Sequence, residues 1–222
     1  MSSASPTAYG LLGMLAGRSW TGYELTQQVR RSLRFIWPSS EGHLYREQKR
    51  LVDLGWATVE EEPAGQRSRK RYSITADGRD ALEQWLATDP EEPHFQVEGI
   101  LRTFFGNHGG HDHLRSSMQS TSASARAMLE EMLGFVDEYL EEGGPLSMLE
   151  QGVIGEFHGR PMIPERLHVV ALAIDITTQM LELLDGFFVD AADEVAVWPS
   201  PDDVSITPST RARLEAIRDR NP

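Results

Sequence analysis

Apolar and polar positions in the first part of the chain recur at helical spacing. Ser5 and Pro6 form a typical helix start, and the apolar residues that follow recur at i, i+3, i+4 and i+7 as far as Gly17. A capping box at 21–24 begins a second helix, and a third extends over 40–54. The pattern therefore predicts three consecutive helices.

The next segment has the pattern of a β-hairpin. The segments 56–62 and 69–75 carry β-branched and aromatic residues and flank a loop at 63–66 that contains proline and glycine. Thr75 is placed to cap a fourth helix. Three helices and a hairpin in this order are typical of a winged helix-turn-helix. We therefore expect an α+β fold, mainly α with a small β-wing.

The third predicted helix has two different faces. At about 100° per residue, Leu44, Gln48 and Leu51 share one face. The opposite face is basic and aromatic, and consists of Gly42, Arg46 and Lys49, flanked by Tyr45 and Arg50. A helix that presents arginine and lysine, with a glycine for close approach, is suited to the major groove of DNA.

Further candidates for DNA contact flank this face. Hydroxyls at the positive end of the helix are placed for a phosphate, and the basic residues of the wing can reach the adjacent backbone or minor groove. Each of these charges, taken alone, is also typical of a solvated helix face. The candidate DNA-binding residues are Ser39, Ser40, Gly42, His43, Tyr45, Arg46, Lys49, Arg50, Gln66, Arg67, Arg69 and Lys70.

The net charge is unevenly distributed along the chain. The formal charge is −13, which by itself argues against nucleic-acid binding. Residues 1–88, however, hold 12 basic and 10 acidic residues, whereas 89–222 hold 9 basic and 24 acidic ones. Two prolines interrupt the helical pattern near 90–93. We therefore expect two units of different electrostatic character.

Several motifs resemble the PadR family of bacterial transcriptional regulators. They cover residues 7–87 in the family's order and lie at 11–15, 21–25, 42–45, 49–56 and 69–78. The resemblance implies a homodimer that binds operator DNA through the winged module and dimerises through a C-terminal helical domain. It also implies repression relieved by a small aromatic or drug-like effector. Where the family often has proline and leucine, this chain has Arg46 and Gln48.

The C-terminal part of the chain is predicted to be helical. A short helix is expected at 97–105 and a long one at 111–140, where weak helix formers allow a break near Ser120. The segment from 143 to 164 reads as a stop followed by loop, with a turn or two of helix. The next helix, 165–188, is apolar around most of its circumference, which favours burial against a partner subunit.

These patterns predict three regions. They are a winged-helix DNA-binding domain at 5–88, a helical dimerisation and effector domain at 94–195, and a linker with a C-terminal helix or tail at 196–222. Twofold pairing would set the recognition helices about 34 Å apart and predicts a pseudo-palindromic operator. Docking and partial disorder both remain open for the tail.

Two further groups of residues suggest ligand chemistry. The imidazoles of His108, His111 and His113, with the carboxylate of Asp112, are plausible metal ligands. Their spacing matches no standard helical pair of metal ligands, so a chance cluster is favoured over a metal-responsive regulator. No cofactor is therefore predicted. Effector binding is the other hypothesis, against plain core packing or an interhelical hydrogen bond. Its candidates are Trp85, Phe95, Phe104, Phe105, Tyr139, Phe157, His168 and Asp175.

Other function classes find little support in the sequence. There is no cysteine, and no phosphate-binding loop, dinucleotide fingerprint, nucleophile elbow or HExxH motif, so we do not expect an enzyme. The N-terminus lacks the basic start of a signal peptide. The apolar stretch 169–188 carries two acids and is expected to be a poor membrane span, which favours a cytoplasmic protein. A winged-helix module for protein contact, without DNA affinity, remains the alternative.

Overall fold

The computed structural model describes residues 4–64, 67–157, 160–200 and 205–220. The chain divides into two compact units, one formed by residues 1–93 and 136–173 and the other by residues 94–135 and 174–222. The domain limits at 88 and 195 remain a prediction.

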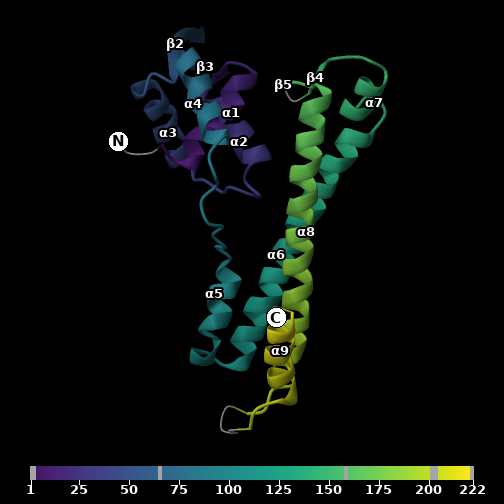
Figure 1. The fold of residues 1–222 in the computed structure, drawn as a ribbon. Coiled ribbons are helices and arrows are strands. Elements are labelled where there is room, and N and C mark those ends of the chain that lie inside the picture. The colour runs from purple at the N-terminus through teal and green to yellow at the C-terminus, as the bar shows by residue number, and fades with distance from the viewer. Residues whose placement is uncertain (1–3, 65–66, 158–159, 201–204, 221–222) are drawn as a thin grey trace. The chain divides into compact units, whose positions relative to one another are not determined.

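The first unit begins with a winged helix-turn-helix module (Figure 1). The expected order of helices and hairpin is confirmed. Its helices are α1 (Pro6–Gly17), α2 (Gly22–Ser32), α3 (Glu41–Asp53) and α4 (Ala76–Leu86), and its strands are β1 (Trp20–Thr21), β2 (Ala57–Ala64) and β3 (Arg67–Ile74).

The helix starts follow the predicted caps. The Ser5 hydroxyl accepts a hydrogen bond from the Ala8 amide at 3.2 Å. Thr21 and Glu24 form both bonds of the capping box, and Ser40 caps α3. These caps satisfy backbone N–H groups that have no partner inside the helix.

The core of this module lies where α1, α2 and α3 meet. Its fully buried side chains include Leu11, Leu12, Leu25, Leu44 and Leu51, and Tyr72 packs on them from the sheet. Burial of such side chains contributes about 1.5 to 3 kcal/mol each. The apolar face predicted for the third helix is therefore its buried face.

The wing is a three-stranded antiparallel sheet in the order β1-β3-β2. Strand β1 was not predicted, because two residues carry no periodicity of their own; Trp20 pairs with Tyr72, and Thr21 with Arg71. Gly55, two residues after the end of α3, has a φ of 74°, a conformation that favours glycine.

The second unit is built on long helices. Its elements include α5 (Glu98–Phe104), the short 3₁₀ helix η1 (Gly106–His108) and the N-terminal part of α6 (His111–Leu140). Helix α6 is continuous, and the allowed break near Ser120 does not occur. Ser122 is buried and donates a hydrogen bond to Asp185 at 2.5 Å, so packing against the next long helix compensates for weak helix propensity.

The segment after α6 contains more regular structure than predicted. Helix α7 (Pro145–Glu150) is followed by a small hairpin of β4 (Glu156–Phe157) and β5 (Arg160–Pro161). Helix α8 (Pro164–Val195) extends seven residues beyond the predicted end at 188. Its last turns are stabilised by burial of Ala191, Ala192 and Val195 against α6.

Helix α9 (Pro208–Asp219) confirms the capped helix expected in the tail. Glu194 of α8 binds α9 by accepting from Ser209 at 3.1 Å and pairing with Arg213. In the described residues one helix, α8, is long and apolar enough to cross a membrane by length and composition alone. Length and composition do not distinguish a span from a helix whose apolar face packs on protein.

Candidate nucleic-acid interface

Helix α3 presents the basic face that its sequence predicts. Leu44 and Leu51 are fully buried, whereas Tyr45, Arg46 and Lys49 are exposed on the other side. The buried Glu47 accepts a hydrogen bond from Ser5 at 2.8 Å, which joins α3 to the start of α1. The core thus fixes the orientation of α3 and leaves its cationic face open.

The basic residues of the module divide into paired and unpaired sets. Arg30 pairs with Glu41, and Arg71 pairs with Glu62 at 2.5 Å. Within the described ranges, no ion pair involves Arg46, Lys49, Arg69 or Lys70. These four cations are therefore available to an anion from outside the module.

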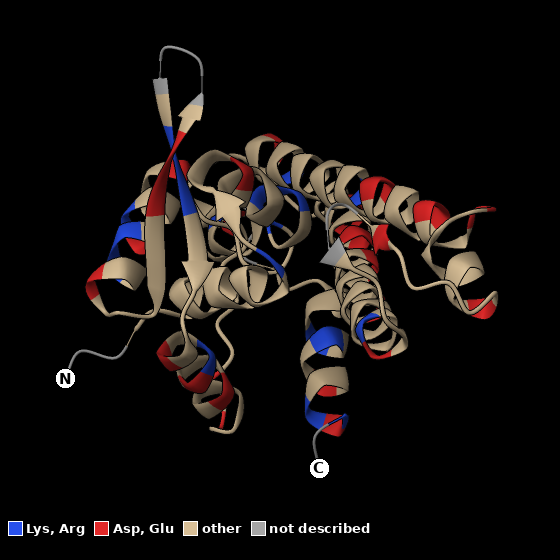
Figure 2. Ribbon diagram, turned by 90° about the horizontal axis from the view of Figure 1, so that it is seen from above, with Lys and Arg blue, Asp and Glu red and all other residues tan. Residues whose placement is uncertain are grey.

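The two long strands of the wing differ in charge. Figure 2 shows acidic residues on β2 and basic residues on β3. The register places Glu61 opposite Lys70 and Glu62 opposite Arg69. Glu62 pairs with Arg71 and not with Arg69, which lies opposite it. Among the described residues, the acids of β2 therefore form no ion pair with Arg69 or Lys70.

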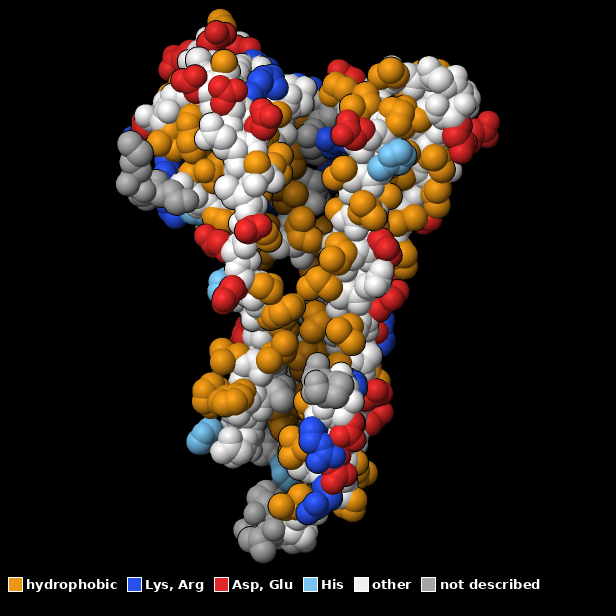
Figure 3. Space-filling model, in the orientation of Figure 1, with side chains coloured by type: hydrophobic (Ala, Val, Ile, Leu, Met, Phe, Trp, Pro, Cys, Tyr) orange, Lys and Arg blue, Asp and Glu red, His pale blue; other side chains and the backbone are white. Residues whose placement is uncertain are grey.

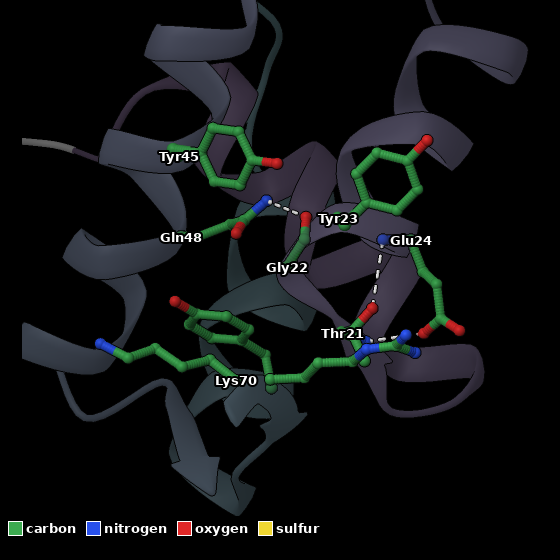
Figure 4. Close-up of a pocket in the computed structure, with 9 residues that line it drawn as sticks. Thr21, Gly22, Tyr23, Glu24, Tyr45, Gln48 and Lys70 are labelled. Atoms are coloured by element: carbon green, nitrogen blue, oxygen red, sulfur yellow. Dashed lines mark hydrogen bonds between the residues drawn. The ribbon is translucent and has the colours of Figure 1, made fainter. Parts of the chain in front are cut away.

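A pocket of 580 Å³ lies between the start of α2, helix α3 and strand β3 (Figure 4). Its lining comprises Thr21, Gly22, Tyr23, Glu24, Tyr45, Gln48, Arg69, Lys70 and Tyr72. Of these, Tyr45, Arg69 and Lys70 were candidates from sequence. The other six were missed, because the sequence presents them as cap and core residues.

Gln48 forms part of the buried wall of this pocket. Its Nε2 donates to the Gly22 carbonyl at 3.1 Å (Figure 4). The same Nε2 donates to the Thr26 hydroxyl at 2.9 Å. Its Oε1 is buried and has no hydrogen-bond partner within the described part of the chain. The departure from the family's leucine therefore ties α2 to α3 through two directional bonds and leaves one acceptor unused.

The Glu24 carboxylate lines the pocket, and its negative charge is partly compensated by hydrogen bonds and nearby arginines. The backbone N–H of Thr21 lowers the pKa of Glu24, and the positive charges of Arg71 and Arg18 act in the same direction. Burial raises the pKa of the Tyr72 hydroxyl, which therefore stays protonated as a hydrogen-bond donor. The pocket thus combines the protonated Tyr72 hydroxyl and two cations with a carboxylate that already has a partner.

The remaining DNA-binding candidates lie around this surface or outside the described residues. The Ser40 hydroxyl accepts from the His43 amide at 3.3 Å as the cap of α3. Arg50 approaches Glu47 at 3.8 Å. Ser39 and Gly42 lie near the start of α3, with Gly42 exposed. Gln66 lies outside the described residues, and for Arg67 only its place in β3 is described.

The effector candidates do not form a single group. Trp85 stacks on Tyr9 at 4.9 Å, Phe104 meets Phe105 at 5.1 Å, and Tyr139 meets Phe157 at 5.0 Å. The other three effector candidates, Phe95, His168 and Asp175, are exposed.

The histidine cluster is spread over two elements. His108 ends η1, whereas His111 begins α6 and packs edge-on against Trp198 at 5.6 Å. In the part of the chain that the structure describes, no three His, Asp or Glu side chains are grouped to hold a metal ion. The metal-responsive alternative therefore gains no support from the geometry.

Comparison with known proteins identifies the family of the winged module. Residues 11–84 match the model of the transcriptional regulator PadR-like family. The negative transcriptional regulator PadR of Bacillus subtilis is 23% identical over 141 residues, which are 63% of this chain and 78% of that protein.

Solved structures share the fold. The crystal structure of Bacillus subtilis PadR in complex with operator DNA has a TM-score of 0.64 and 18% identity, and covers 85% of this chain and 98% of that one. The structure of the same regulator with p-coumaric acid has a TM-score of 0.57 and 18% identity, over 87% and 99% of the two chains. The winged module of this chain therefore matches the PadR-like family of transcriptional regulators.

Proposed function

We propose that this protein is a homodimeric transcriptional regulator that binds operator DNA through α3 and the wing. The observation that carries the proposal is the set of unpaired cations around one surface: Arg46 and Lys49 on α3, and Arg69 and Lys70 on β3. Arginine and lysine in such positions read guanine edges or contact phosphates. The fold shared with a PadR–operator complex supports this reading.

In this proposal the pocket beside α3 receives the DNA backbone. A phosphate there would meet the positive end of α2 at Gly22, the Lys70 ammonium and the Tyr45 hydroxyl. The ion pair between Arg71 and Glu62 keeps the strand in place without occupying the pocket. Phosphate contacts set the register of α3, and its side chains then select the sequence.

Dimerisation is supported by the surface of α8. Apolar side chains appear along much of its length in Figure 3. One exposed stripe has the spacing of helix-pairing residues and consists of Val169, Leu172, Ile176, Met180, Leu183 and Phe187. A stripe of this size is better explained by a second copy than by exposure to water. Twofold symmetry then predicts a pseudo-palindromic operator.

Repression and release by a small molecule complete the proposal. The name of the Bacillus subtilis relative, a negative regulator, supports repression, and its complex with p-coumaric acid supports an effector. A regulator that acts on operator DNA works in the cytoplasm, where we place this protein.

The test is selection of genomic fragments on the purified protein, followed by gel shifts on the best fragment at two salt concentrations. We expect a pseudo-palindromic site whose affinity falls steeply with salt. Arg46→Ala with Lys49→Ala should weaken binding at least tenfold, whereas Arg211→Ala, on α9, should not. No enrichment after refolding without ligand would favour the protein-contact alternative instead.

A further inference from the structure

The pocket between α2, α3 and β3 is larger and more aromatic than a DNA phosphate requires. Its 580 Å³ lies within the range of about 300 to 1,000 Å³ that small-molecule sites have. Its lining includes the three tyrosines Tyr23, Tyr45 and Tyr72. A phosphate bound at the cations of β3 would leave the aromatic part of the pocket unfilled. The pocket therefore has room for a ligand that carries a ring as well as an anion.

Gln48 brings an unused hydrogen-bond acceptor to this pocket. The side chain is fully buried, and its Oε1 has no partner in the described residues, where the other buried side-chain atoms without a partner are nitrogens of arginine or tryptophan. A Cβ added to Gly22 would lie 2.9 Å from Oε1 and 3.3 Å from the Tyr72 ring, so Oε1 lies among residues that line the pocket. Figure 4 shows the Gln48 amide pointing toward Gly22, beside Tyr45. Because a buried polar atom without a partner calls for an explanation, we expect a ligand of this pocket to carry an N–H or O–H donor.

Strand β3 supplies positive charge to the same pocket. Lys70 and Tyr72 are two residues apart on the strand, so their side chains point to the same face of the sheet. Over the described residues, neither Lys70 nor Arg69 takes part in an ion pair. The carboxylate of the lining, Glu24, has Arg71 at 3.9 Å and lies across the pocket from the Lys70 ammonium in Figure 4. An anion at Lys70 would therefore meet positive charge and no uncompensated carboxylate.

We propose that this pocket binds a free nucleoside monophosphate whose base carries an exocyclic amino group. The base packs against the rings of Tyr45 and Tyr72, since every base offers a flat face for an aromatic side chain. Its amino group donates to Oε1 of Gln48, and its phosphate binds the Lys70 ammonium. A base that is paired and stacked inside duplex DNA cannot enter such a pocket, whereas that of a mononucleotide can.

A nucleotide in this pocket would compete with operator DNA. The Lys70 ammonium and the Tyr45 hydroxyl are the groups that the proposed function assigns to a DNA phosphate at the same place. They cannot bind both ligands at once, so nucleotide binding would release the protein from DNA. This regulatory meaning rests on the proposed function, whereas nucleotide binding itself does not.

The first test is isothermal titration calorimetry of the full-length protein at constant ionic strength. The probes are AMP with IMP, and CMP with UMP, because the second member of each pair has a carbonyl oxygen in place of the amino group. AMP or CMP should bind at least tenfold tighter than its partner, and also tighter than its nucleoside, ribose 5-phosphate or inorganic phosphate. No binding at millimolar AMP and CMP, or equal affinities within both pairs, would overturn the proposal. Equal affinity for inorganic phosphate would show an adventitious ion only. Tighter binding of a short single-stranded oligonucleotide would assign the pocket to unpaired DNA instead.

Variants assign the binding to the pocket. Gln48→Leu, which removes the acceptor but keeps an apolar side chain, should abolish the preference for the amino-bearing nucleotide. Lys70→Gln, at an exposed position, should weaken binding of both members of a pair at least tenfold. Arg79→Gln, at an exposed position of α4, is the matched control for the loss of one positive charge and should bind as the wild type does. Unchanged binding by the Gln48 and Lys70 variants would refute the assignment.

A gel shift separates this site from the DNA-binding proposal. The active nucleotide should release the wild-type protein from the selected operator, and Gln48→Leu should need at least tenfold more of it. If the nucleotide binds in the pocket while no operator can be found, the site stands and the regulator proposal fails. If an operator is bound while no nucleotide binds, the regulator proposal stands and the nucleotide site is refuted.

Discussion

Gln48 of α3 donates a hydrogen bond through Nε2 to the backbone carbonyl of Gly22, the first residue of α2, at 3.1 Å. Thr26 donates to the same carbonyl at 2.9 Å, so that oxygen keeps a partner even without Gln48. The contact joins the two helices that border the pocket, and it places the unpartnered Oε1 beside the Gly22 backbone, where an added Cβ would lie 2.9 Å from it.

Gln48→Leu should not destabilise the protein. The change removes a buried acceptor without a partner, a defect of about 1 to 3 kcal/mol, and loses hydrogen bonds of about 1 kcal/mol each. We therefore expect the free energy of unfolding from urea titration to stay within about 1 kcal/mol of the wild-type value. Gln48→Ala, which also leaves a cavity, should lower the free energy of unfolding by about 2 kcal/mol or more. A large loss in the leucine variant would show that the hydrogen bonds outweigh the unused acceptor.

Removal of the two unpaired wing cations should change the salt dependence of DNA binding. Arg69→Ala with Lys70→Ala should reduce the slope of log affinity against log salt by about one for each lost phosphate contact in each protomer. The loss of binding affinity should be similar for operator and unrelated DNA, because phosphate contacts carry little sequence information. The slope is measured by fluorescence anisotropy at several salt concentrations. An unchanged slope would place both cations outside the interface.

Charge on the exposed stripe of α8 should separate the subunits. Leu172 and Leu183 are 70% and 72% exposed in the single chain. Leu172→Glu with Leu183→Glu would place four carboxylates in the proposed dimer interface, and light scattering after size exclusion should show the mass of a monomer. Ala171→Glu adds a charge at an exposed position away from the stripe and should leave the mass unchanged. A stable dimer of the double variant would exclude this face.

Asp185 should make the contact between α6 and α8 sensitive to acid. The hydrogen bond from Ser122 lowers the pKa of Asp185, and Arg126 adds to the shift. Because the folded-state pKa lies below the ordinary value of 3.8, this stabilisation is present above that pH and is lost as the pH falls through the folded-state pKa.

The comparison of Asp185→Asn with the wild type tests whether this contribution to stability is lost on acidification. The variant should unfold at lower urea concentration at pH 7, and the difference should shrink as the pH falls below about 4 and through the folded-state pKa. Asp175→Asn, at an exposed position of the same helix, controls for the loss of one negative charge. A difference that grew on acidification would contradict the assignment.

Local sequence rules were sufficient for much of the winged module. The caps at Ser5, Thr21 and Ser40 form as predicted, because each involves residues within one turn of helix. The division of α3 into a buried and a basic face follows from the helical repeat, and needed only the core to orient it. The continuous α6 could not be predicted from propensity, because Ser122 bonds to Asp185, 63 residues away in sequence.

The sequence by itself determined which residues share a face, where helices begin, and that the basic residues gather in the first 88 positions. Tertiary structure decided which of those charges are already neutralised, since Arg71 pairs with Glu62, whereas Arg69 and Lys70 form no ion pair with any residue that the structure describes. It also left the Nε of Arg166 buried, with no hydrogen-bond partner among the described residues. The physical reason is range: caps and helical periodicity act over a few residues, whereas an ion pair depends on where the fold places two distant segments.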